Sequence, residues 1–180
     1  MCGRGRYGRR MAQFEDRHRA LRRKYLSLGT GELAAVAMFT YSAVWVITPR
    51  LSHDEQALTF MAGVAPLVLV LSQAGAYWLL ARRWVTVRPM PRRLARLYRV
   101  FETLDVLVLV ATGAYVALHL RAPGGAGALA LVVWLFALVE FINYYVVRLS
   151  YPWRVWPAQV GQWRTPRLIQ DLRAAGVSPD

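Results

Sequence analysis

Long apolar stretches alternate with charged connections along this chain. Four stretches carry few charged side chains, and we predict that each is a membrane-spanning helix: residues 33–49, 56–81, 101–120 and 127–148. A helix that rises 1.5 Å per residue needs about 20 residues to cross a hydrocarbon core of ~30 Å. A soluble core helix would place charged residues every three or four positions, but none occurs from Ala57 to Ala81. The pattern predicts an all-α, membrane-embedded protein.

The connections predict how these helices are arranged. Ser52–Glu55 has the form of a capping box at the start of the second span. The short glycine-rich hairpin at 122–127 makes the third and fourth spans antiparallel neighbours. We therefore predict an antiparallel four-helix bundle. The chain divides into a basic tail with an amphipathic helix (1–30), the transmembrane domain (31–151), and a tryptophan-rich interfacial segment with a short cytoplasmic helix (152–180).

Charge predicts the orientation of the bundle. Of the 23 lysine and arginine residues, all but Arg50 and Arg121 flank the predicted spans on one side. Because basic connections stay in the cytoplasm, we expect a multi-pass protein of a bacterial inner membrane with both termini cytoplasmic. The first apolar stretch ends without a small-x-small cleavage pattern, so we expect it to remain in the mature protein.

The N-terminal region alternates basic and apolar side chains at helical spacing. The apolar face of the predicted amphipathic helix consists of Phe14, His18, Leu21, Tyr25 and Leu28. Such a helix lies on the inner membrane surface, where each basic residue near anionic lipid contributes about 1 kcal/mol. We expect anionic lipids as partners, together with a second copy of the chain or another membrane protein. Nucleic acid is not expected, because a topology-setting tail accounts for GRGRYGRR.

The fourth apolar stretch keeps a carboxylate inside the predicted bilayer. Glu140 lies about ten residues from the inner end of its helix, which is ~15 Å deep. Its face includes Asn143 and Tyr144, by i, i+3, i+4 spacing, and should point into the bundle. Polar residues at matching depth complete a predicted intramembrane cluster: Glu140, Asn143, Tyr144, Ser72, Gln73, Tyr41 and Thr112. The Glu140 carboxyl must be protonated or have a cationic partner there.

A second polar group is predicted at the cytoplasmic mouth of the bundle. Glu102 and Asp105 lie three positions apart, and pairing with Arg99 or Arg148 would form a charged ring. The alternative is that these groups only join helices, at about 0.6–2 kcal/mol per contact, and we favour it for Glu102 and Asp105. For Glu140 both a structural and an ion-binding role stay open. Gly113 and Ala117 predict a face on the third span that allows close helix packing.

Motifs that carry chemistry are scarce in this sequence. Cys2 is the only cysteine, and His119 is alone in its span, so neither a cysteine metal site nor a haem pair can form. HExxH, GxSxG and Walker patterns do not occur. We predict no catalytic residue, no metal site, no cofactor and no enzymatic activity.

The segment EFINYYVVRLSYP, followed about a dozen residues later by RTPRLIQDL, resembles a family of small uncharacterised bacterial membrane proteins. In that family a Glu-aromatic-Ile-Asn-Tyr segment closes the last of four spans. The resemblance covers roughly the last fifty residues, implies a four-span bundle and singles out Glu140, Asn143 and Tyr144. This chain has Val146 where relatives have His, which puts a metal or proton-shuttling role there in doubt.

Two functions follow from these expectations. The first is a non-enzymatic scaffold, assembly or regulatory protein of the inner membrane. The alternative is a small proton- or cation-coupled transporter or channel in which Glu140 binds the ion. A membrane enzyme acting on a lipid or a quinone ranks third.

Overall fold

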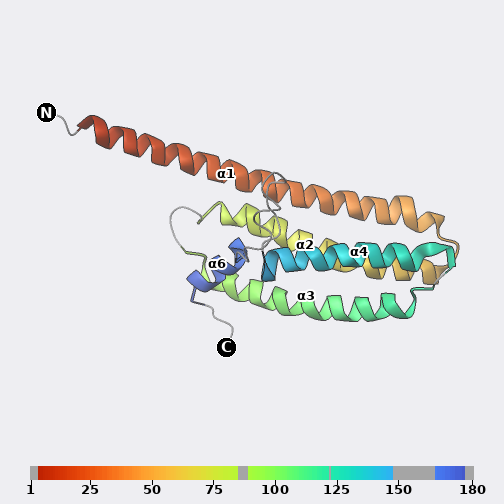
Figure 1. The fold of residues 1–180 in the computed structure, drawn as a ribbon. Coiled ribbons are helices and arrows are strands. Elements are labelled where there is room, and N and C mark those ends of the chain that lie inside the picture. Colours follow the sequence, from red (N-terminus) through yellow and green to blue (C-terminus); the bar gives the residue numbers. More distant parts are fainter. Residues whose placement is uncertain (1–3, 85–88, 122, 148–164, 177–180) are drawn as a thin grey trace, which may run out of the picture.

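The computed structural model describes residues 4–84, 89–121, 123–147 and 165–176. Within these ranges the chain forms helices and turns but no strand, so the all-α prediction is confirmed. Four long helices run side by side and one short helix lies against an end of the bundle (Figure 1). The elements in chain order are α1 (Arg4–Tyr41), η1 (Ser42–Ile47), η2 (Thr48–Arg50), α2 (Asp54–Ala81), α3 (Arg92–Leu118), η3 (Pro123–Gly125), α4 (Ala126–Phe141), η4 (Ile142–Val146) and α6 (Arg167–Ala174).

The four long helical segments are each long and apolar enough to cross a membrane. They cover Glu15–Arg50, Asp54–Ala81, Arg92–Leu118 and Ala126–Val146. Large apolar side chains cover the outside of the bundle; Trp45 is 72% exposed, which an aqueous protein would not tolerate over so wide a surface. The chain is therefore a small multi-pass membrane protein.

The first span and the basic segment before it form one helix. From the sequence we expect an amphipathic helix that ends near residue 30, but α1 continues without interruption to Tyr41. Thr30 lies within the helix, and its hydroxyl donates to the carbonyl of Leu26, at 2.9 Å. Gly29 is needed here for packing, since an added Cβ would lie 2.7 Å from Cγ of Leu79 on α2. The N-terminal part of α1 extends well beyond the bundle (Figure 1).

The second span is the centre of the bundle, because α2 contacts α1, α3 and α4. Its inward side chains are almost fully buried, among them Phe60, Leu67 and Val70. Gly63 lets α2 and α4 approach backbone to backbone, since a Cβ there would lie 2.4 Å from the carbonyl oxygen of Ala130. This backbone contact fixes the separation of α2 and α4 at the level of Gly63.

One local prediction about the start of the second span needs correction. The predicted capping box at Ser52–Glu55 does not form: α2 begins at Asp54, and the Ser52 N–H donates to the Gln56 side chain at 3.1 Å. Glutamine one turn into the helix takes the role that a glutamate would have in a capping box.

The third and fourth spans pack through a tryptophan over a glycine. The ring of Trp134 lies against Gly113, where a Cβ would come within 2.6 Å of it, and the indole N–H donates to the Leu109 carbonyl at 3.1 Å. The predicted close contact at Gly113 is confirmed. Ala117, expected on the same face, is exposed, so the predicted small-residue face ends at Gly113.

Candidate functional site

Polar side chains gather at one end of the bundle. We call this the basic end; it is formed by the bundle termini Ala81, Arg92 and Val146 together with α6. Three of the buried polar residues in the described part of the chain lie here: Gln73, Asp105 and Asp171. Each of them joins two or more helices by side-chain hydrogen bonds.

Asp171 fastens α6 to the bundle. One carboxylate oxygen accepts hydrogen bonds from the Tyr77 hydroxyl (2.9 Å) and the Trp84 indole (3.1 Å). The other oxygen lies 3.2 Å from Nε of Arg167, one turn earlier on α6. A buried carboxylate is costly unless donors surround it, and here three donors do so.

The sequence of α6 explains why it docks in this way. Leu168, Ile169 and Leu172 share one face with Asp171 and are buried, while Arg173 points outward. Pro166 precedes Arg167 as the N-cap residue, and its fixed φ suits the start of the helix. The predicted short C-terminal helix is confirmed; the tryptophan-rich segment before it lies outside the described residues.

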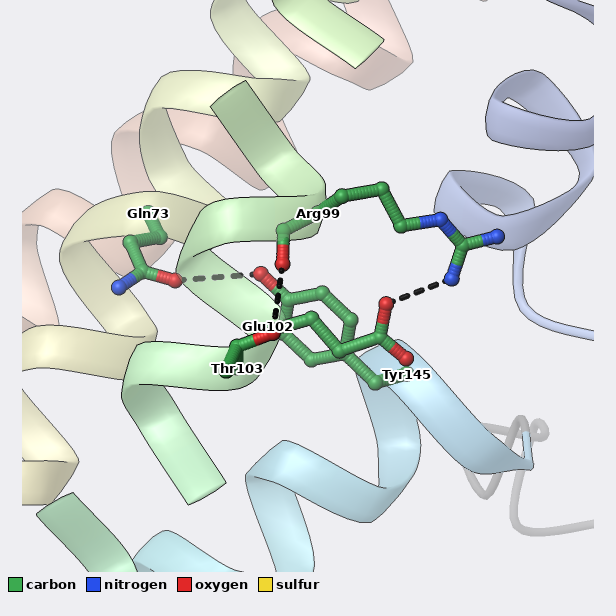
Figure 2. Close-up of polar contacts among 5 residues, drawn as sticks. All are labelled: Gln73, Arg99, Glu102, Thr103 and Tyr145. Atoms are coloured by element: carbon green, nitrogen blue, oxygen red, sulfur yellow. Dashed lines mark hydrogen bonds and ion pairs between the residues drawn. The ribbon is translucent and has the colours of Figure 1, made fainter. Parts of the chain in front are cut away.

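Asp105 is the most enclosed carboxylate of the spans, with 1% of its surface exposed. Its Oδ1 accepts from the Gln73 side-chain amide at 2.8 Å. The Gln73 oxygen in turn accepts from the Tyr145 hydroxyl at 3.1 Å, a contact drawn in Figure 2. The Tyr98 hydroxyl donates to the Gln73 backbone carbonyl at 3.2 Å. The structure places Asp105 in a hydrogen-bonded group between α2, α3 and η4, which agrees with the favoured alternative that Asp105 joins helices.

Glu102 takes the position expected of it. It pairs with Arg99, at 2.6 Å, on the same face of α3, and Figure 2 shows this pair beside the Gln73–Tyr145 contact. Arg148, the other predicted member of the mouth, lies outside the described residues.

A π-helical turn, η4, directs two neighbouring tyrosines to different helices. Tyr144 and Tyr145 are both buried although they are consecutive in sequence. Tyr145 reaches Gln73, as described, whereas the Tyr144 hydroxyl donates to the Glu32 carboxylate of α1 and accepts from the Trp78 indole at 3.4 Å. Wider turns of this kind occur often at functional sites. Here η4 is the last turn of the helix, because Val147 is extended.

Glu140 lies within electrostatic range of a second carboxylate, that of Glu32. It accepts a hydrogen bond from Asn143, and it is close enough to Glu32 for the two charges to repel each other. In the described part of the chain neither Glu32 nor Glu140 has an ion-pair partner, so a cationic partner for Glu140, one of the two predicted alternatives, is not among these residues. We call Glu32, Glu140, Asn143, Tyr144 and Trp78 the carboxylate pair site.

The structure brings together only part of the predicted intramembrane cluster. Glu140, Asn143 and Tyr144 meet at the carboxylate pair site, and Gln73 lies in the adjoining Asp105 group. The hydroxyls of Ser72 and Thr112 instead donate to carbonyls of their own helices, at 2.6 and 2.7 Å. The remaining predicted member, Tyr41, is 62% exposed on the outside of α1.

A cavity of about 510 Å³ adjoins the carboxylate pair site. Its walls come from α1, the end of α2, η4 and α6. The lining residues are Leu21, Lys24, Tyr25, Leu28, Glu32, Trp78, Asn143, Tyr144, Arg167 and Gln170.

Sequence reasoning missed Glu32, Tyr77, Trp84 and Asp171 as members of this end. Glu32 directly precedes the first apolar stretch and reads as its boundary, and Asp171 belongs to a tail with no apparent partner. The available signal was the α6 pattern, since a carboxylate on the apolar face of an amphipathic helix indicates a buried polar contact. No group of three side chains suited to bind a metal occurs in the described ranges.

Comparison of the chain with models of protein families, with curated proteins and with solved structures found no match. The resemblance of the last span to a bacterial four-span family therefore stays a prediction. The function has to be inferred from the basic end itself.

Proposed function

We propose that this multi-pass membrane protein works by binding at its basic end, as a scaffold, assembly or regulatory component, and not by catalysis. The observation that carries this proposal is the docking of α6 through Asp171 onto Tyr77 and Trp84. This contact holds a helix that follows the spans against the end of the bundle (Figure 1). A fixed platform of this kind suits the recognition of a partner.

The packing of the other half of the bundle supports binding over conduction. Phe60, Val64 and Leu67 are at most 4% exposed, and Gly63 brings the backbones of α2 and α4 into contact. Water and ions have no space to pass between α2 and α4 at this level in the conformation described. The polar groups lie between this packed region and the basic end. They are therefore placed to bind a partner and not to conduct ions.

The proposal is tested by removing the platform. We would isolate the tagged chain from native membranes after mild crosslinking and identify retained proteins and lipids by mass spectrometry. We expect one retained protein or lipid in fixed ratio to the chain. The native sequence and the control Arg173→Ala should both retain it, and Asp171→Ala should lose it. A component retained equally by Asp171→Ala, or none at all, would contradict the proposal.

A second function is favoured by one observation, the closeness of Glu32 and Glu140. Two carboxylates without a described cationic partner suit a proton or a cation as ligand, as in a small coupled transporter. Its test is flux of protons and organic cations into liposomes that contain the purified chain alone. If the native chain shows flux and Glu140→Gln abolishes it with folding intact, the result would favour transport and overturn the binding proposal. Flux that is absent, or that survives the substitution, would end the transport hypothesis for Glu140.

A further inference from the structure

The cavity at the basic end has charges of both signs on its walls. Lys24 on α1 and Arg167 on α6 supply the positive charges, and Glu32 supplies the negative charge, with Glu140 close by. The aromatic rings of Tyr25, Trp78 and Tyr144 also line the cavity, so its wall combines charged, aromatic and apolar side chains.

The positive side suits a phosphate. Lys24 makes no ion pair within the described part of the chain, and Arg167 contacts Asp171 through Nε, which is one of its three nitrogens. The two cations come from different helices and face one cavity, an arrangement that binds a single anion between them. Asp171 holds Arg167 in place for this role.

The negative side suits an ammonium group. One oxygen of Glu32 accepts from Tyr144, and repulsion from Glu140 makes a bound cation favourable. Tyr25 and Trp78 pack edge to face, with ring centroids 5.0 Å apart, and both line the cavity. Carboxylates beside aromatic faces are the usual setting for ammonium recognition, because ring faces attract cations.

We propose that this cavity binds the headgroup of a phospholipid that carries both a phosphate and an ammonium, as phosphatidylethanolamine does. The phosphate lies between Lys24 and Arg167, and the ammonium lies at Glu32. A lipid is favoured over a free phosphoamine because Leu21 and Leu28 extend the lining onto the exposed, apolar side of α1, where acyl chains can follow. At about 510 Å³ the cavity has room for the headgroup and the start of those chains.

This inference goes beyond the binding proposal and does not depend on it. The cavity would hold the same lipid whether the protein acts as a scaffold or as a transporter. Its failure would show in lipid selectivity, whereas failure of the proposed function would show in the crosslinking and flux experiments.

The first experiment measures which lipid the purified, delipidated full chain binds. Native mass spectrometry would follow titration in detergent with phosphatidylethanolamine, with phosphatidylglycerol of the same acyl chains, and with free phosphoethanolamine. An added ammonium–carboxylate contact predicts at least about tenfold tighter binding of phosphatidylethanolamine than of phosphatidylglycerol. We expect weak binding of free phosphoethanolamine, because it lacks acyl chains. Equal binding of the two lipids, or tighter binding of phosphatidylglycerol, would overturn the proposal; strong binding of the free compound would replace the lipid by a soluble phosphoamine.

Substitutions of charged residues test which side chains bind the headgroup. Glu32→Gln should remove the preference between the two lipids, and Lys24→Gln should weaken both. Glu15→Gln, an exposed substitution of the same charge on the same helix, is the matched control and should change neither. A preference that survives Glu32→Gln would contradict the assignment.

A measurement on the native sequence removes any dependence on the folding of variants. Lys24 is the only lysine in the chain, so its acetylation reports on one cavity residue. Phosphatidylethanolamine should slow acetylation of Lys24 about tenfold at saturation, as measured on the isolated peptide, and phosphatidylglycerol should slow it less at equal concentration. Acetylation at the same rate with and without phosphatidylethanolamine would overturn the proposal.

Discussion

Replacing Asp171 by alanine should release α6 from the bundle. The substitution leaves the Tyr77 hydroxyl and the Trp84 indole, both buried, without the acceptor that they share at 2.9 and 3.1 Å. A buried donor without an acceptor costs about 1–3 kcal/mol, so two cost at least about 2 kcal/mol. That free energy raises the population of undocked α6 about 30-fold. The apolar contacts of Leu168 and Leu172 remain, so the bundle itself should stay folded.

Hydrogen exchange measured by mass spectrometry checks this expectation. Because exchange follows local opening, the amides of Arg167–Ala174 should exchange about 30-fold faster in the variant, while those of α2 in the core change little. Arg173→Ala is the matched control on the same helix, since its side chain points outward, and should change the rates by less than about twofold. Unchanged exchange in Asp171→Ala would refute the reasoning, because it would mean that the carboxylate does not hold α6.

Two further substitutions test the packing and the polar group in the spans. Gly63→Ala should destabilise the bundle by about 1–3 kcal/mol, because the new Cβ meets the backbone of Ala130. Gly31→Ala is the control, since nothing lies within 4 Å of its added atom, and it should be neutral or stabilise by about 0.5–1 kcal/mol. Steric-trap unfolding in bicelles measures both, and equal effects would contradict the close approach. Asp105→Ala should cost about 1–2 kcal/mol in the same assay because it removes the acceptor of Gln73, whereas Asp105→Asn, which keeps an acceptor, should cost less. Equal losses in these two variants would show that the hydrogen bond is not what Asp105 contributes.

The sequence by itself determined the number of spans, their positions to within a few residues at most ends, and their helical form. Long stretches almost without charge can satisfy their backbone only as helices in a bilayer, so the pattern left little choice. It also placed Glu140, Asn143 and Tyr144 on one face, and these three residues do meet in one site. The largest difference is at the start, where α1 begins at Arg4 and joins the basic tail to the first span.

Only the tertiary structure decided which groups face each other. The rotation of each helix is set by close contacts such as Gly63 on Ala130, and no apolar pattern within one span specifies them. This rotation encloses Asp105 and sets Glu140 beside Glu32, and the π-helical turn then sends Tyr144 and Tyr145 to different neighbours. Contacts between residues far apart in the chain, such as Tyr77 with Asp171, depend on how all the helices pack, because their energy arises only once the spans have assembled.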